Sequence, residues 1–386
     1  MRKILEVQDL LLRFYTYEGV VKALEGVNLH MIEGESLGVV GETGCGKTMT
    51  GLSILSLTPS PGRIEGGRIF FQSDEGWVDI LSLDEETVRR IRGREISMIF
   101  QEPNAALNPL LTVEEQISEV LIQHRREEFI KKVLNAIEED LQKTERKALS
   151  RAFIYKIEKK IYENMLKNPK SLLVRVFSKT PILRRYQNRL RKEVRREVVR
   201  ILKEIKIPDP ERVVDMYPHE LSGGMQQRVV IAMALACNPK LLISDEPTTN
   251  LDVTVEAQIL NLIKELKSKF GSSILYITHD MGVVAEICDR VAVMYAGSVC
   301  EIADVFEIFR NPLHPYTKAL LESIPRPGKK FKSIEGTVPN LVNPPPGCRF
   351  HPRCPKAMPI CAKVKPDMVN IDGHFVACHL YRKGRK

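Results

Sequence analysis

The sequence predicts an α/β fold built around a phosphate-binding loop, with a helical region and a cysteine-rich C-terminal segment. Three observations predict it: one glycine-rich motif between a strand and a helix, recurring apolar strands that end in polar residues, and a long stretch of helical periodicity. The motif matches G-x-x-x-x-G-K-[ST] at every fixed position. It consists of Gly41, Glu42, Thr43, Gly44, Cys45, Gly46, Lys47 and Thr48.

The context of this loop supports a nucleotide site. The mostly apolar residues 37–40 lead into it as a strand, and residues 48–57 leave it with a helical pattern. Its glycines let backbone N–H groups surround a phosphate, and the following helix adds the positive end of its dipole. Lys47 supplies a charge for the β- and γ-phosphates, and Thr48 offers a hydroxyl to Mg²⁺.

Residues 4–40 predict short strands with turns between them, punctuated by glycines. Three aromatic residues, Phe14, Tyr15 and Tyr17, lie in this part. An exposed aromatic near a nucleotide site can stack on adenine, and any of the three can equally belong to the core. The sequence leaves these two interpretations open.

Residues 62–82 predict further strands, followed by a short helix from Asp84. The next strand, residues 96–100, ends in Gln101. A glutamine at the carboxyl end of a strand beside a phosphate-binding loop can reach Mg²⁺ or the attacking water.

Residues 113–205 are mostly helical in pattern and strongly basic. Residues 125–200 hold 23 Lys and Arg against 10 Asp and Glu, a net charge of +13, whereas the whole chain has +9. The commoner interpretation is a set of solvated helices. The alternative is a surface for anionic lipid headgroups or for a partner protein.

A second glycine-bearing helix start follows the helical region. Ser222 is placed to cap a helix that begins at Gly223, and the glycines leave its first amides uncovered. Such a terminus can bind an anion, and the alternative is an ordinary capped helix that binds nothing.

Two later strands end in polar residues that suit nucleotide hydrolysis. Residues 241–244 lead to Asp245, which can hold Mg²⁺ through water, and to Glu246, which can orient and polarise the attacking water. Residues 274–278 lead to His279, which can contact the γ-phosphate. Two acidic residues after an apolar strand can also lie in a loop without a catalytic role. The prediction of a nucleotide site therefore depends on the order of all these motifs along the chain.

Composition and cysteine placement limit the class of protein. The chain of 386 residues is 43% hydrophobic and 28% charged, has no apolar run of membrane-spanning length and begins without a signal-peptide core, so we expect it in the cytoplasm. Half of its cysteines crowd the tail, and clustered thiols in a cytosolic chain suggest a metal site. They are Cys348, Cys354, Cys361 and Cys378.

Together these residues resemble an ATP-binding cassette, in the order that this family has them. The block Leu221–Arg228, with its Leu-Ser-Gly-Gly-x-Gln pattern, is the most specific motif. The resemblance implies binding of ATP and Mg²⁺, with Lys47, Gln101, Glu246 and His279 serving hydrolysis. It also implies a sandwich in which two cassettes enclose two nucleotides. In that sandwich Ser222, Gly223 and Gly224 close over the ATP of the opposite subunit. The resemblance also implies that Gln226 and Asp252 belong to the nucleotide-binding residues.

A narrower resemblance is to the ATPases of dipeptide and oligopeptide importers. It is carried by residues 100–109, 311–321 and 347–354. In that family the four tail cysteines are associated with a [4Fe–4S] cluster. Zn²⁺ is the alternative, although gaps of five, six and sixteen residues lack the paired C-x-x-C spacing usual for structural zinc.

The resemblance implies a division of the chain into four parts: residues 1–112 and 229–325 form the ATPase core with an antiparallel β subdomain, 113–228 a helical subdomain, and 326–386 a regulatory or dimerisation domain. Two departures stand out: the helical segment is longer than usual by tens of residues, and Asn250 stands where many relatives have a small residue.

The implied function is the ATPase subunit of a peptide importer, peripheral on the cytoplasmic face of the membrane. Its partners would be a second ATPase subunit, forming a heterodimer with a paralogue, two permease subunits and an extracytoplasmic substrate-binding protein. Residues 126–192 would face anionic lipid. The alternatives are an importer of oligosaccharides or nickel, a soluble cassette ATPase acting on nucleic acid, and a regulatory module built on the cysteine tail. We do not expect nucleic acid as a partner, because the chain has one cassette and no sustained heptads.

Overall fold

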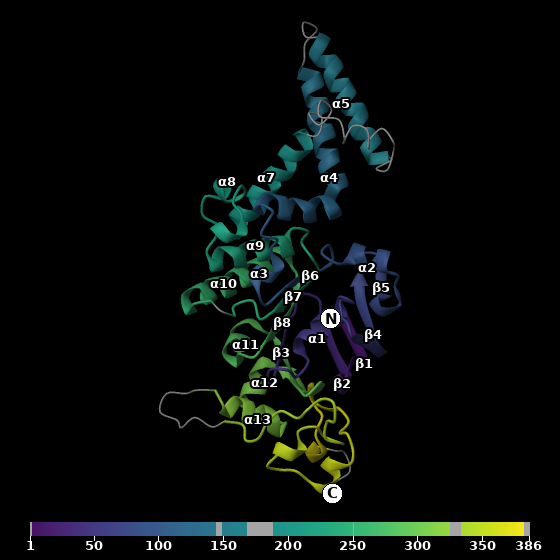
Figure 1. Cartoon of the computed structure of the whole chain (residues 1–386), viewed down its shortest axis with the longest axis vertical. Coiled ribbons are helices and arrows are strands. Elements are labelled where there is room, and N and C mark those ends of the chain that lie inside the picture. The colour runs from purple at the N-terminus through teal and green to yellow at the C-terminus, as the bar shows by residue number, and fades with distance from the viewer. Residues whose placement is uncertain (1, 144–148, 168–187, 250, 325–332, 382–386) are drawn as a thin grey trace. The chain divides into compact units, whose positions relative to one another are not determined.

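The computed structural model describes residues 2–143, 149–167, 188–249, 251–324 and 333–381. The chain divides into two compact units (Figure 1). The ATPase unit comprises residues 1–102 and 238–386, and the helical unit comprises residues 103–237. The C-terminal tail belongs to the first unit, so the four-part division given above stays a prediction at its finer boundaries.

The larger sheet of the ATPase unit has eight strands in the described residues, in the order β11-β12-β10-β9-β3-β8-β7-β6. Its central strands β9, β3, β8, β7 and β6 are parallel, and β10 to β12 add antiparallel strands at one edge. The strands are β3 (Ser36–Val40), β6 (Ile96–Ile99), β7 (Leu241–Asp245), β8 (Ser273–Thr278), β9 (Arg290–Tyr295), β10 (Ser298–Asp304), β11 (Val369–Ile371) and β12 (His374–Val376). β3, β6, β7 and β8 are buried along their whole length, which explains their nearly continuous apolar sequences.

The smaller sheet is antiparallel, in the order β2-β1-β4-β5. Its strands are β1 (Lys3–Thr16), β2 (Gly19–Ile32), β4 (Gly62–Ser73) and β5 (Gly76–Asp79). The expectation of short strands over residues 4–40 was wrong, since β1 and β2 each have 14 residues. Register shifts interrupt their pairing, for example between Val7 and Leu10, and such irregularities break the apolar alternation that would have revealed one long strand.

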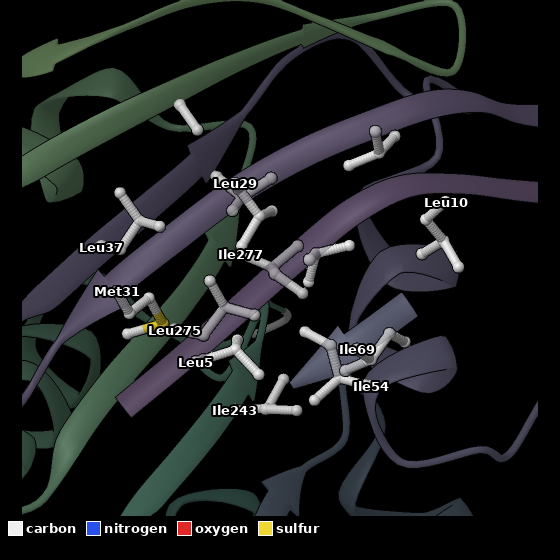
Figure 2. Packing of buried hydrophobic residues seen from close by; sticks show 14 of the residues in the cluster. Leu5, Leu10, Leu29, Met31, Leu37, Ile54, Ile69, Ile243, Leu275 and Ile277 are labelled. Carbon is white, nitrogen blue, oxygen red and sulfur yellow. The ribbon is translucent and has the colours of Figure 1, made fainter. Parts of the chain in front are cut away.

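The core of the ATPase unit lies between the two sheets. Leu5, Leu29 and Met31 of the antiparallel sheet belong to the same buried cluster as Leu275 and Ile277 of the parallel sheet (Figure 2). Each of these side chains is at most 3% exposed. Burial of such side chains contributes about 1.5–3 kcal/mol each, so this packing holds the parallel strands in register behind the loop.

Helices complete the ATPase unit. The helix predicted from Asp84 is confirmed: α2 begins at Glu85, and the Asp84 carboxylate accepts a hydrogen bond from the Thr87 N–H at 2.8 Å. The helices of this unit are η1 (Ile80–Ser82), α1 (Lys47–Ile54), α2 (Glu85–Ile91), α10 (Val253–Phe270), α11 (Met281–Ile287), α12 (Val305–Arg310) and α13 (Pro315–Glu322).

The helical unit confirms the helical pattern predicted for residues 113–205 wherever the structure describes them. Its helices are α3 (Pro103–Ala106), α4 (Val113–Lys143), α5 (Leu149–Lys167), α7 (Asn188–Glu204), α8 (Pro210–Val213), η3 (Pro218–Glu220) and α9 (Gly223–Leu235). α4 packs against both α5 and α7. It is kinked at Arg125, whose guanidinium bonds Glu128, Glu197 and the carbonyl of Ala236.

The tail, yellow in Figure 1, contains η4 (His351–Arg353), η5 (Pro359–Ala362) and η6 (His379–Tyr381) besides β11 and β12. β12 pairs with β10, and His374 lies 2.6 Å from the buried carboxylate of Glu301. Phe350 is buried in an aromatic cluster with Tyr295 and Tyr316. The tail is therefore an integral part of the ATPase unit.

Candidate functional site

Four polar segments meet at one edge of the parallel sheet. The order β3-β8-β7-β6 and their parallel direction bring the carboxyl ends of these strands together. The phosphate-binding loop follows β3, His279 follows β8, Glu246 follows β7 and Gln101 follows β6. This edge is where open α/β sheets bind ligands.

The loop needs glycine at two positions. At Gly41 a Cβ atom would overlap the carbonyl oxygen of Met294. Gly46 precedes α1 with φ +100°, and a Cβ there would meet Leu24 and the carbonyl of Ala23. A side chain at either position would clash, so the backbone of the loop can pass close to its neighbours only with glycine.

Lys47 and Thr48 lie where the loop enters α1. The Lys47 ammonium donates to the carbonyls of Gly41 at 2.8 Å and Glu42 at 3.3 Å, and the residue is only 6% exposed. The Thr48 hydroxyl donates to Oδ1 of Asp245 at 3.1 Å. Burial raises the pKa of Asp245 to about 6, and the Thr48 hydrogen bond partly offsets this. A hydroxyl beside a buried carboxylate suits Mg²⁺, which favours oxygen ligands and stabilises the charged carboxylate.

Glu246 forms the centre of a polar cluster. Its Oε2 accepts hydrogen bonds from Nε2 of Gln101 at 3.3 Å and from the Thr249 hydroxyl at 3.2 Å, and Nδ1 of His279 lies 3.1 Å from its Oε1. The backbone of Glu246 has φ +43°, an uncommon conformation for a residue other than glycine. Such strain concentrates at functional sites, and here it turns the side chain that follows Asp245 in a different direction.

The three candidate adenine aromatics have different surroundings. Phe14 packs against the hydrophobic core of the ATPase unit. Tyr15 donates a hydrogen bond to Glu65 and lies beneath the guanidinium of Arg63. Tyr17 is fully exposed. Tyr17 therefore has the most accessible ring of the three.

The predicted cap at Ser222 is confirmed in the helical unit. α9 begins at Gly223, and the Ser222 hydroxyl accepts from the Met225 N–H at 3.4 Å. Ser222 and Gly223 are exposed, and a Cβ on Gly223 would meet no described atom within 4 Å. Gln226 instead donates to the carbonyl of Pro218 at 2.8 Å, so its amide braces the turn before α9.

Asp252 caps α10, because its carboxylate accepts from the Val255 N–H at 2.9 Å. The substitution noted at Asn250 lies outside the described residues. Gly224, the remaining residue of the Ser-Gly-Gly segment, is half-buried in the first turn of α9.

The tail fold gathers the four predicted cysteine ligands into one region. Burial, with smaller contributions from the neighbouring Cys361, Cys378 and Cys354, raises the pKa of the Cys348 thiol to about 11. The donor chemistry therefore suits a thiophilic metal. However, among the described residues no three His, Cys, Asp or Glu side chains are arranged to hold a metal ion. The structure thus does not show the predicted metal site.

Comparison with protein families identifies this arrangement. The model described as "ABC transporter" matches residues 24–249, more than half of the chain. The chain belongs to this family. It is an ABC ATPase, and its hydrolysis of ATP is coupled to transport. A second model, "Oligopeptide/dipeptide transporter, C-terminal region", matches residues 300–361 of the cassette protein.

Curated relatives match this ABC ATPase over nearly its whole length. The dipeptide transport ATP-binding protein DppD of Bacillus subtilis is 42% identical over 98% of this chain and 95% of its own length. The oligopeptide transport ATP-binding protein OppD of Salmonella typhimurium is 40% identical over 97% of this chain and 93% of its own. Both matches include the tail, and both place the chain among the ATP-binding proteins of peptide transport.

Solved structures confirm the fold of this ABC ATPase. The dimeric bacterial ABC transporter cassette MJ0796 aligns with a TM-score of 0.54 at 24% identity, over 78% of this chain and 99% of its own. The protein cbiO1 of Clostridium perfringens, part of an ABC transporter complex, aligns with a TM-score of 0.51 at 25% identity, over 81% of this chain and 92% of its own. The predicted α/β fold with a phosphate-binding loop is correct. Among the described residues, no helix is long and apolar enough to cross a membrane.

The sequence alone missed three residues that contact the site. Thr249 holds the carboxylate of Glu246, while Tyr316 and Arg353 bond the loop residue Glu42. Thr249 stands close to Glu246 and could have been found from its spacing. Arg353 is 311 residues from Glu42, and no sequence pattern connects them.

Proposed function

We propose that this chain is the ATP-hydrolysing subunit of an importer that takes up dipeptides or oligopeptides. The observation that carries the proposal is that its similarity to peptide transport proteins continues through the tail, over residues 300–361. Its partners in this role are two permease subunits and an extracytoplasmic substrate-binding protein, and it works at the cytoplasmic face of the membrane.

The test is reconstitution of the chain with its permeases and binding protein in vesicles. Labelled peptide should accumulate when ATP is supplied on the side of the cassette, and Glu246→Gln should abolish uptake. Uptake of an oligosaccharide or Ni²⁺ and not of peptide would refute the peptide substrate and leave the transport function supported. ATPase activity that responds to DNA or RNA and not to the permeases would refute both the peptide substrate and the transport function.

The geometry supports separate roles for these residues in ATP hydrolysis. Lys47 and the loop amides hold the phosphates, and Thr48 with Asp245 provides oxygen ligands for Mg²⁺, which neutralises phosphate charge when bound. Glu246 acts as the base that accepts a proton from the attacking water. Gln101 and His279 hold the two oxygens of Glu246 in position, and the exposed ring of Tyr17 stacks on adenine.

The exposed helix start at Ser222 and Gly223 supports a sandwich of two cassettes. Its uncovered amides suit the phosphates of a nucleotide held by a facing subunit. We propose a paralogue as that subunit. Glu246→Gln should elute as a monomer with Mg-ATP alone and as a heterodimer when the paralogue is added, as measured by light scattering. A homodimer formed with Mg-ATP alone would refute the proposal that the facing subunit is a paralogue, and it would support the sandwich of two cassettes.

The tail cysteines support a [4Fe–4S] cluster, because the tail fold brings thiols together: the Cys348 N–H donates to the carbonyl of Cys361 at 2.8 Å, and the nearby Cys354, Cys361 and Cys378 contribute to the raised pKa of Cys348. Anaerobically purified protein should contain about four iron and four sulfide atoms per chain and absorb near 400 nm. Cys354→Ser should lose both signals. A content of one zinc and no iron per chain would assign the site to zinc. The absence of both metals from the purified protein would show that the tail holds no resident metal.

α5 supports contact with anionic lipid, because it exposes Phe153 and Ile154, which are 66% and 44% exposed, near Lys156 and Lys160. Basic residues beside exposed apolar ones favour a lipid interface. Binding to phosphatidylserine vesicles should weaken in the Phe153→Ser, Ile154→Ser variant and in a chain lacking residues 126–192. Unchanged binding in both would end this proposal.

A further inference from the structure

The loop residue Glu42 is bound by the C-terminal tail. Nη1 of Arg353 donates to its Oε2 at 2.8 Å and Nη2 to its Oε1 at 3.1 Å, so the guanidinium and carboxylate form a two-point ion pair. The Arg353 side chain is 6% exposed and that of Glu42 is 25% exposed. A planar, largely desolvated pair of this kind fixes geometry much better than an exposed ion pair.

The remaining donors of Arg353 hold the guanidinium itself in place. Its Nε donates to the carbonyl of Glu335 at 2.9 Å and Nη2 to the carbonyl of Ile334 at 3.3 Å. Nη1 also reaches the hydroxyl of Tyr295 at 3.2 Å. Arg353 is therefore held by the tail and by β9 independently of its contact with the loop.

Glu42 is held from two further directions. Its backbone N–H donates to the hydroxyl of the buried Tyr316 at 3.0 Å, and its carbonyl accepts from Lys47 at 3.3 Å. Since a phosphate-binding loop acts through the direction of its backbone N–H groups, a residue bound at N–H, carbonyl and carboxylate sets part of the shape of the loop.

A second arginine of the same tail segment supports the loop indirectly. Arg349 donates to the carbonyls of Ala296 and Lys22 and pairs with Glu25 at 2.8 Å. The next residue after Ala296, Gly297, donates its N–H to the carbonyl of Cys45 at 2.9 Å. The segment Cys348–Cys354 thus contacts the loop directly at Glu42 and supports it indirectly at Cys45, through residues 296 and 297.

We propose that Arg353 is a positioning residue for ATP, and that the tail segment Cys348–Cys354 preorganises the phosphate-binding loop through it. The tail then serves nucleotide binding by its own cassette, besides any role of its thiols. Loss of the Arg353–Glu42 pair frees the loop to adopt other conformations, and binding of ATP must then order it again.

The experiment measures ATP affinity, kcat, KM and thermal stability in the full chain. Arg353→Gln should raise the Kd for a fluorescent ATP analogue about tenfold and raise KM similarly, with kcat at saturating ATP within about twofold of the parent. Glu42→Gln, which keeps the size of the side chain, should do the same. The double variant should be no worse than either single one, because both remove one interaction.

The matched control is Arg290→Gln. Arg290 forms a similarly buried pair with Glu35 at 3.0 Å, but at the amino end of β3, away from the loop. This variant should lower the melting temperature and leave the Kd for ATP unchanged. Arg353→Lys, which keeps a charge but not the two-point pair, should recover part of the affinity.

The proposal is overturned if Arg353→Gln and Glu42→Gln lower the melting temperature as Arg290→Gln does while the Kd for ATP stays at the parent value. It is also overturned if affinity losses in the two variants add independently. If Arg353→Gln does not fold, Glu42→Gln and Arg353→Lys decide the question by the same measurements.

Discussion

Nδ1 of His279 lies 3.1 Å from Oε1 of Glu246, although the two residues follow different strands of the parallel sheet. The carboxylate is largely buried and the imidazole is 60% exposed. When both ring nitrogens carry a proton, Nδ1–H of the histidine donates to Glu246 and Nε2–H is left as a second donor. The pair can therefore orient a base and contact a phosphate oxygen at the same time.

Glu246→Gln should retain ATP binding and slow hydrolysis by about a hundredfold or more, because the amide cannot accept a proton from water. Phosphate release and analogue binding measure the two effects separately. Glu95→Gln is the control, since Glu95 is a buried carboxylate at the amino end of β6 that pairs with Lys240. Normal turnover in Glu246→Gln would refute its assignment as the base.

His279→Ala should lower kcat by about tenfold or more and leave the Kd for ATP nearly unchanged, because His279 positions Glu246. Steady-state kinetics separates kcat from KM. His30→Ala, which removes a half-buried histidine of β2, should keep both parameters. A change confined to the Kd for ATP would contradict the role given to His279.

Lys47→Ala should weaken ATP binding by about thirtyfold or more, equivalent to ~2 kcal/mol for loss of a buried charged contact. Titration with a fluorescent ATP analogue measures this. Lys240→Ala removes a lysine that pairs with Asp74 and Glu95 elsewhere in the ATPase unit, and it should bind ATP normally. An unchanged Kd for ATP in Lys47→Ala would contradict the assignment of residues 41–48 as the phosphate-binding loop.

His314 should make stability depend on pH. Burial lowers the pKa of His314 to about 4, and its Nδ1 accepts the Tyr316 N–H that begins α13. In the unfolded chain the imidazole takes up a proton near pH 6.5, so the free energy of unfolding should fall as the pH drops from about 6.5 to 4, by up to about 3 kcal/mol.

Urea unfolding across this pH range tests the effect in parallel with His314→Asn, which keeps a capping acceptor without a titrating group. As the pH falls, the free energy of unfolding of the parent should decrease more than that of His314→Asn. Parallel pH curves for the two proteins would show that the buried histidine is not responsible.

Local patterns were enough to predict the elements of the site. The motif from Gly41 to Thr48, the cap at Ser222 and the apolar strands before Asp245 and His279 all depend on spacing over a few residues. The same patterns failed for β1 and β2, because register shifts interrupt the alternation on which strand prediction depends.

The sequence by itself determined the motifs that predict a nucleotide site and the order in which they occur. Only the tertiary structure decided which of them meet. Gln101 reaches Glu246 across 145 residues because β6 and β7 are neighbours, and Arg353 reaches Glu42 because the tail packs against β9 and β10. Helix and strand periodicity records local backbone geometry, whereas contacts at such separations follow from how the sheets and the tail share one core.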